Sequence, residues 1–164
     1  MRRSVYVVAA IALAACESDD GDFAFQRINP ETLNTHPAFS HVTTVSGDSR
    51  FIYVAGQTDV APDYVPGAND CRHDDLRGQI MGVQENVGHG LAAAGATWDD
   101  VVFIRRFVLD VPEYLRVRSD TANPLPTPWE NRPPPPSTLL GVVALAEPCY
   151  LIEMDVFAAV AEDD

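Results

Sequence analysis

The residue types best suited to metal chemistry are concentrated in one short segment of the chain. This segment holds Asp70, Cys71, His73, Asp74 and Asp75, whose side chains are of the kinds that bind metal ions. Capping of a following helix and solvation of a loop explain the same residues, and the cysteines lack the CxxC spacing typical of zinc sites. We therefore expect no metal ion.

Histidines supply a second type of candidate, because a neutral imidazole can act as a general base. His41 and His89 are of this type, although an ordinary edge-strand histidine and a helix-surface histidine account for them as simply. Ser40 directly precedes His41, and neighbouring residues on a strand point to opposite faces. The two therefore do not form a nucleophile–base pair.

The composition excludes several classes of enzyme and partner. All 11 basic residues are arginine, so Schiff-base catalysis and a lysine-bound pyridoxal phosphate are excluded. The net charge is −13. Without Arg2 and Arg3 it becomes −15, because 11 − 2 = 9 basic groups then face 24 acidic ones. Such a charge argues against binding to nucleic acid or to an anionic membrane surface.

Residues 1–16 are typical of a lipoprotein signal peptide. Arg2 and Arg3 precede an apolar stretch, and Leu13-Ala14-Ala15-Cys16 matches a lipobox in which Cys16 receives lipid. The alternative is an ordinary cleaved signal with an incidental cysteine. Glu17 follows in place of the aspartate that favours inner-membrane retention, so we expect anchoring at the outer membrane, facing the periplasm.

The rest of the chain is expected to contain one domain. Residues 17–27 are acidic and lack an apolar period, which predicts a tether, and residues 161–164 form an acidic tail. Residues 28–160 have the length of a single domain. Cys71 and Cys149 could form a disulfide in an oxidising compartment, within or between subunits, or could remain two small buried thiols.

Periodic apolar residues predict strands and helices that alternate along residues 28–160. Residues 42–45 and 51–54 are expected to pair as a hairpin around Gly47-Asp48, and residues 76–94 form a helix with one apolar stripe. Residues 101–109 predict a strand, and a second helix is expected from about residue 113 until Asn123-Pro124. Residues 138–145 and 150–160 supply two final strands.

The resulting order, β-β-α-β-α-β-β, predicts an α+β sandwich with both helices on one face of a sheet. The other face of such a sheet stays apolar and needs a cover. Self-association of the chain would provide one.

Four groups of residues together resemble the Rid/YjgF family of reactive-intermediate (imine/enamine) deaminases. They are Phe39-Ser40-His41-Val42, Val54-Ala55-Gly56-Gln57, the run from 75 to 102, and Ser137-Thr138 with Ile152-Glu153-Met154-Asp155. The resemblance implies a chorismate-mutase-like fold with a mixed sheet, and a homotrimer with ligand clefts between subunits. It also implies hydrolysis of 2-iminoacids without metal or cofactor.

The resemblance assigns roles to individual residues. Glu153 corresponds to the glutamate that positions or activates water, and Gly56 and Thr138 correspond to backbone contacts with the ligand. Phe39 stands where typical deaminases have a tyrosine, so the hydroxyl is lost. Arg118 corresponds to a polar residue of the second helix.

One position departs from the family pattern. The arginine that binds the substrate carboxylate corresponds to Pro136, which has neither a charge nor a backbone N–H. Losing a bidentate charged pair typically removes several kcal/mol of recognition, on the order of two decades or more in affinity. Arg118 or Arg132 could enter the cleft instead, or could simply be solvated.

The sequence therefore predicts an exported, lipid-anchored, Rid-like homotrimer that binds a small organic molecule and could hydrolyse imines or enamines. Its membrane contact would be made only through the anchor, and no nucleic acid or cofactor is expected. The alternatives are a non-catalytic ligand-binding module and an envelope protein that protects against stress.

Overall fold

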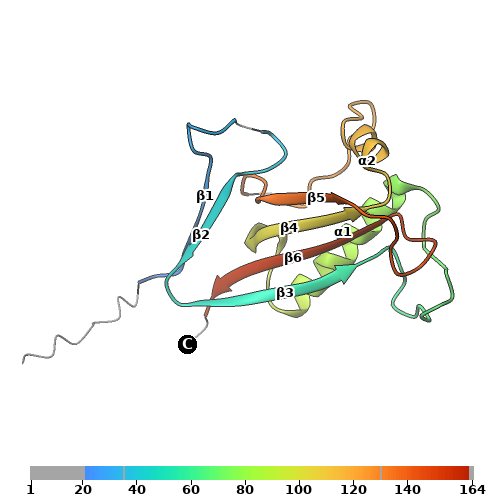
Figure 1. Ribbon diagram of the computed structural model, residues 1–164. Coiled ribbons are helices and arrows are strands. Elements are labelled where there is room, and N and C mark those ends of the chain that lie inside the picture. Colours follow the sequence, from blue (N-terminus) through green and yellow to red (C-terminus); the bar gives the residue numbers. More distant parts are fainter. Residues whose placement is uncertain (1–20, 35, 130, 163–164) are drawn as a thin grey trace, which may run out of the picture.

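The centre of the fold is a four-stranded mixed sheet. The computed structural model describes residues 21–34, 36–129 and 131–162. The strand order is β3 (Ser49–Gln57), β6 (Ile152–Ala161), β4 (Val101–Val108) and β5 (Ser137–Gly141) (Figure 1). Strand β6 is antiparallel to both of its neighbours, whereas β4 and β5 are parallel.

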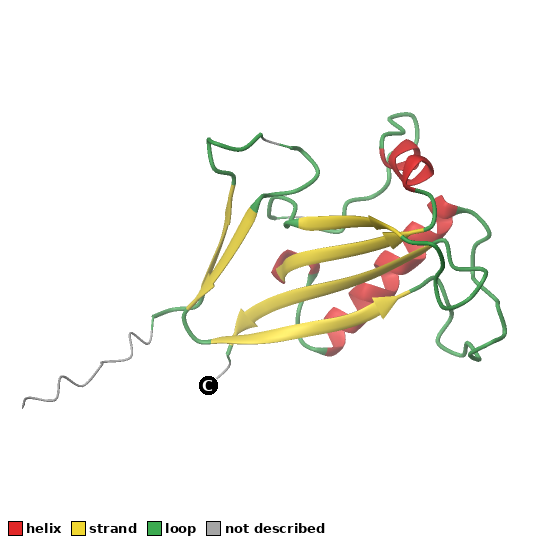
Figure 2. Ribbon diagram, in the orientation of Figure 1, coloured by secondary structure: helices red, strands yellow, loops and turns green. Residues whose placement is uncertain are grey.

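Two helices pack on one side of this sheet, as the sequence predicts. Helix α1 (Leu76–Ala93) crosses behind the strands, and α2 (Val111–Arg118) lies near one end of them (Figure 2). The predicted stripe of α1 is buried against the sheet: Leu76, Ile80, Val83, Val87 and Leu91. The α+β class, with helices on a mixed sheet, is confirmed.

The ends of α1 follow from local chemistry. The Asp75 side chain accepts a hydrogen bond from the backbone N–H of Gly78 and so caps the first turn. Gly95 follows the last turn with φ at +71°, a conformation that glycine adopts without steric cost.

Strands β1 (Ala24–Ile28) and β2 (Val42–Ser46) form a separate antiparallel pair. The predicted hairpin between 42–45 and 51–54 is therefore wrong, because β1 pairs with β2 while β3 pairs with β6. The expected tether is also too long, because β1 lies within its last residues. Apolar periodicity does not predict β1, because its residues are only exposed or partly buried. Backbone hydrogen bonds to β2 hold this strand in place.

Two elements end earlier than the sequence predicts. Helix α2 ends at Arg118, because the Asp120 side chain accepts hydrogen bonds from the backbone of Ala122 and Asn123 and forms an ion pair with Arg77. These bonds offer the backbone an alternative to the helix. Strand β5 ends at Gly141, and the following segment leaves the sheet as a loop.

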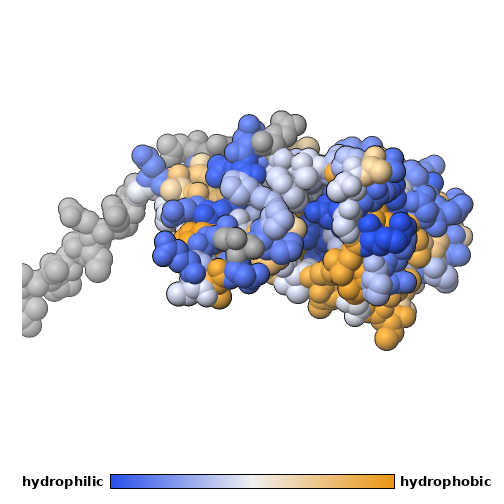
Figure 3. Space-filling model, turned by 90° about the horizontal axis from the view of Figure 1, so that it is seen from above, coloured by the Kyte–Doolittle hydropathy of each residue, from blue (hydrophilic) through white to orange (hydrophobic). Residues whose placement is uncertain are grey.

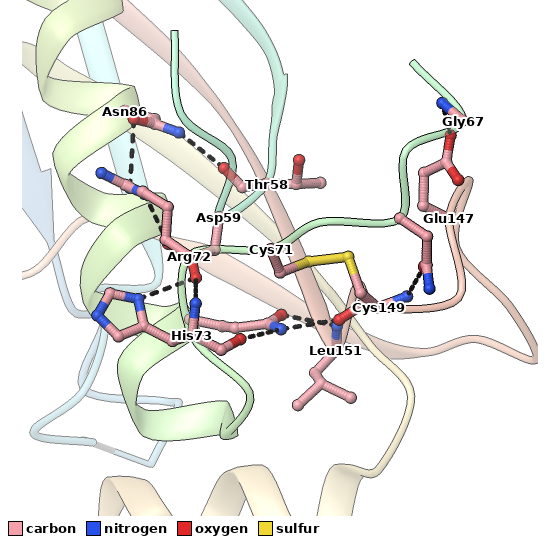
Figure 4. Close-up of a disulfide and its surroundings, with 12 residues drawn as sticks. Thr58, Asp59, Gly67, Cys71, Arg72, His73, Asn86, Glu147, Cys149 and Leu151 are labelled. Atoms are coloured by element: carbon pink, nitrogen blue, oxygen red, sulfur yellow. Dashed lines mark hydrogen bonds and ion pairs between the residues drawn. A yellow bond between two sulfur atoms is a disulfide. The ribbon is translucent and has the colours of Figure 1, made fainter. Parts of the chain in front are cut away.

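The loop between β3 and α1 is held by a buried carboxylate. Asp59 is fully buried and accepts hydrogen bonds from Arg72 Nε at 3.0 Å and from the backbone N–H of His73 at 2.8 Å (Figure 4). The Nδ1 atom of His73 lies 2.9 Å from the same carboxylate. A Cβ atom at Gly82 would lie 1.8 Å from Asp59 Oδ1, so this turn of α1 requires glycine.

A disulfide joins this loop to the segment before β6. The structure links Cys71 to Cys149 within one chain. The buried Gln79 side chain reinforces the link, because its amide donates to the carbonyls of His73 and Cys149 and accepts from the backbone of Leu151. Segments far apart in sequence are thereby tied to one turn of α1.

The surface is mostly hydrophilic when seen from above, with hydrophobic side chains gathered in separate patches (Figure 3). Within the described ranges, no helix is long and apolar enough to cross a membrane. Among those same residues, no three His, Cys, Asp or Glu side chains form a group that could hold a metal ion.

Candidate functional site

Strand alternation gives β4 two chemically different faces. Ile104 and Val108 are fully buried on the side of the helices, and Arg106 lies between them on that side. Arg105 projects from the opposite side, where its Nε and Nη2 atoms bind the two oxygens of Asp155 on β6 at 3.0 and 2.6 Å. We call this opposite side the open face, because neither helix lies on it.

The open face carries a group of aromatic side chains. Tyr53 contacts Phe157 at 5.1 Å between ring centroids, and Phe103 contacts the same ring at 6.1 Å. Phe51 and Tyr53, both on the edge strand β3, are 54% and 70% exposed. Such exposed aromatic surface marks a site of association or binding.

Glu153 also lies on the open face, directly against β3. A Cβ atom at Gly56 would lie 1.8 Å from Glu153 Oε1, so the missing side chain of Gly56 makes room for the carboxylate. Partial burial, followed by repulsion from Asp155, raises the pKa of Glu153 above its ordinary value. A carboxylate that is partly desolvated, and that has no cationic partner among the residues described, suits a general base.

Thr138 and Pro136 complete this side of the site. Thr138 pairs in register with Arg105 and is exposed. Pro136 lines a shallow pocket of about 540 Å³ with His41, Phe51 and Phe103. No charged side chain replaces the missing arginine among the residues that line this pocket.

A second pocket, of about 590 Å³, lies on the helix side of β5. We call it the helix-side pocket. Its walls come from the loop before β2, from α2 and from strands β4 and β5. The lining residues are His36, Pro37, Ala38, Phe39, Arg106, Tyr114, Leu115, Arg118, Ser119, Ser137 and Leu139. The rings of His36 and Phe39 stack at 4.7 Å and form one wall.

Arg106 is the most unusual residue of the helix-side pocket. Only 8% of it is exposed, and its guanidinium forms no hydrogen bond or ion pair with any residue that the structure describes. Burial, together with the nearby charge of Arg118, lowers the pKa of Arg106. A buried and unpartnered cation is costly to keep in a fold.

Comparison with known sequences and structures places this fold in a family. A sequence model described as "Endoribonuclease L-PSP" matches residues 31–160. YyfB from Yersinia pestis, described as a protein of unknown function of the conserved Rid family, is 30% identical with a TM-score of 0.67. That match covers 83% of this chain and 98% of YyfB. The chain belongs to the Rid/YjgF family.

More distant solved structures support the fold alone. YyfA from Yersinia pestis is 23% identical with a TM-score of 0.54, over 84% of this chain and 100% of YyfA. Yeast Mmf1 is 21% identical with a TM-score of 0.53, over 85% of this chain and 100% of Mmf1. No curated protein sequence matches the chain.

The residues that the family resemblance singles out fall into separate groups in one chain. Gly56, Thr138 and Glu153 lie on the open face, whereas Phe39 and Arg118 line the helix-side pocket. Arg132 reaches neither group, because its guanidinium stacks 3.8 Å above the ring of Phe25. Cys16 lies outside the described residues.

Arg106 was not among the candidates that the sequence suggested, although a signal for it exists. Every second residue of this part of β4 faces the helices, namely Ile104, Arg106 and Val108. The first and the last of them are apolar, and Arg106 lies between them. A charge at a core-facing strand position breaks the pattern that burial demands. A charged residue at a position that should be apolar often indicates a functional site.

Proposed function

We propose that this chain binds a small organic molecule and hydrolyses an imine or enamine without a cofactor. The observation that carries the proposal is the Glu153 carboxylate, which packs against Gly56 on the open face and has a raised pKa. Membership of the Rid/YjgF family supports a role of this kind.

The chemistry requires one water molecule and one base. Glu153 accepts a proton from water as the oxygen attacks the imine carbon, which leaves a C–N single bond, and the carboxyl group then passes this proton to nitrogen. The C–N bond breaks as the new hydroxyl group gives up its proton, so that the carbonyl forms and ammonia leaves. The products are a carbonyl compound and ammonia. Backbone groups near Gly56 and Thr138 would orient the ligand beside the carboxylate.

We propose that the working form is a homotrimer with clefts between subunits. The exposed rings of Phe51 and Tyr53 support this, because association would remove them from water. Association would also place side chains of a neighbouring subunit near Glu153, which is only partly buried in a single chain.

RNA cleavage, which the family description suggests, is disfavoured by charge. A polynucleotide substrate needs clustered basic residues, and this chain has a net charge of −13. Four of the described arginines, Arg72, Arg77, Arg105 and Arg116, are already paired with carboxylates.

Ligand binding without turnover is a second candidate, and Pro136 favours it. The family's carboxylate-binding arginine is absent at this position, so an iminoacid would be held less firmly beside Glu153. In that case the open face would bind a ligand and release it unchanged.

We also propose that the chain is exported and anchored through lipid on Cys16, at the outer membrane facing the periplasm. The lipobox at 13–16 and the link between Cys71 and Cys149 support this, because disulfides persist in oxidising compartments. Radiolabelled palmitate should enter the wild-type chain but not Cys16→Ser, and an unlabelled wild type would contradict the anchor.

The test of catalysis generates 2-iminobutanoate in situ and follows its hydrolysis by the wild type and by Glu153→Gln. We expect acceleration by the wild type and a loss of about 100-fold or more in the variant, the scale of general-base catalysis. Glu162→Gln is the matched control, because Glu162 is exposed just beyond the end of the same strand. No acceleration over buffer by the wild type would refute hydrolysis of this substrate.

A further inference from the structure

We propose that the helix-side pocket is a binding site for an oxyanion, a carboxylate or phosphate group of a small ligand, and that Arg106 is its principal contact. This site lies on the other side of the sheet from Glu153. It does not depend on the hydrolysis proposed above.

The first argument is the state of the Arg106 side chain. Its guanidinium carries five N–H donors, and no hydrogen bond joins them to an acceptor among the described residues, although the residue is only 8% exposed. Its nitrogen atoms are not sealed in the core, so they open to the pocket. Buried polar groups in folded proteins nearly always have partners. The pocket beside Arg106 is where a partner can enter.

The second argument is the charge of the residues around the pocket. Arg106 and Arg118 both line it, whereas no aspartate or glutamate does. The two arginines are close enough for their charges to interact. The chain as a whole is strongly acidic, so a pocket with two cations and no carboxylate is a distinct local environment.

The contrast with other arginines in the chain makes the same point. On the neighbouring strand position, Arg105 is paired with Asp155, and on the same helix, Arg116 is paired with Glu113. Arg106 and Arg118 have no such partner within the described ranges. An anionic ligand would supply the missing counter-charge to both.

The rest of the pocket defines the size and character of the ligand. Phe39, Leu115 and Leu139 contribute apolar side chains to the lining, and Tyr114 and Ser137 contribute residues that carry hydroxyl groups. A volume of about 590 Å³ suits a small organic molecule. A planar guanidinium binds a carboxylate or phosphate through two parallel hydrogen bonds.

The experiment titrates the full-length chain with 2-oxobutanoate, inorganic phosphate and uncharged butanone at constant ionic strength, using calorimetry. We expect at least one anion to bind and butanone not to bind. Preference for 2-oxobutanoate would identify a carboxylate site, and preference for phosphate would identify a phosphate site.

Three variants assign the binding to residues. Arg106→Leu should weaken anion binding about 30-fold, as expected for the loss of one charged pair. Its melting temperature should be unchanged or higher, because a buried charge without a partner is replaced by an apolar side chain. Arg118→Gln should weaken binding about 5-fold or more, and the control Arg116→Gln should bind like the wild type.

Three results would overturn the proposal. The first is a wild-type chain that binds neither anion. The second is Arg106→Leu that binds as tightly as the wild type. The third is a destabilised Arg106→Leu together with unchanged binding by Arg118→Gln, because Arg106 would then have only a structural role. Loss of imine hydrolysis in Glu153→Gln, with anion binding intact, would leave this site unaffected.

Discussion

At the level of single residues, Glu153 and Arg106 are in similar environments on opposite sides of the sheet. Each is an ionisable group, partly or almost fully buried, without an oppositely charged partner among the described residues. Other charged side chains of the fold do have an oppositely charged partner, as in the ion pair between Arg105 and Asp155. Groups whose pKa values are shifted by burial are often those that bind or react with ligands.

The raised pKa of Glu153 predicts a specific dependence of stability on pH. The unfolded chain loses this proton at a lower pH than the folded chain does, so ionisation of Glu153 costs folding free energy. The free energy of unfolding should therefore fall as pH rises from the ordinary glutamate value through the raised pKa. Urea unfolding between about pH 4 and pH 7 measures this slope.

The variant Glu153→Gln should remove this contribution to the slope, and Glu162→Gln should retain it. Asp155→Asn should reduce it, because repulsion from Asp155 is one cause of the raised pKa. An identical pH dependence in the wild type and in Glu153→Gln would show that the carboxylate titrates normally.

Single residues also show what the sequence could and could not predict about the site. The motif around Glu153 was recognisable, and its contact with Gly56 follows from pairing between β3 and β6. Arg106 is not identified from the sequence, because two adjacent arginines on a strand do not reveal which of them faces the core. Only the orientation of β4 shows that one of them is buried.

At the level of elements, the loop between β3 and α1 is an ordered part of the fold. Asp59 binds Arg72 and His73, and the disulfide at Cys71 joins the loop to the approach to β6. Glycine at position 82 lets α1 approach the carboxylate closely. These contacts fix the end of the sheet at which Gly56 meets Glu153.

Substitution of Asp59 should therefore be strongly destabilising. Asp59→Ala removes the acceptor for Arg72 and for the His73 backbone, and breaking a buried charged pair typically costs about 3–5 kcal/mol. Glu85→Ala breaks the exposed contact of the same arginine and should cost about 1 kcal/mol or less. Urea unfolding compares the two, and equal losses would contradict a special role for Asp59.

The elements also separate what local sequence determines from what it does not. Helix α1 was predicted because its apolar stripe and its caps are encoded within a few residues. The pairing of β1 with β2 was not, because strand partners depend on which edges are free in the whole fold. Gly47 does lie in a turn between β2 and β3, but these two strands pair with β1 and β6 and not with each other.

At the level of the whole molecule, the open face determines how the site is completed. Its aromatic side chains are exposed in one chain, and the predicted ligand residues are divided between two sides of the sheet. A homotrimer would cover the open face and enclose Glu153 between subunits. Activity should therefore require association.

Light scattering on the size-exclusion eluate of the full-length chain, with imine hydrolysis assayed across the peak, tests this requirement most directly. We expect a mass of about three chains that coincides with the activity. Tyr53→Glu should yield inactive monomers, because it places a charge on the open face, whereas Val143→Glu, in an exposed loop, should remain an active trimer. A wild-type monomer with full hydrolytic activity would contradict a cleft built between subunits.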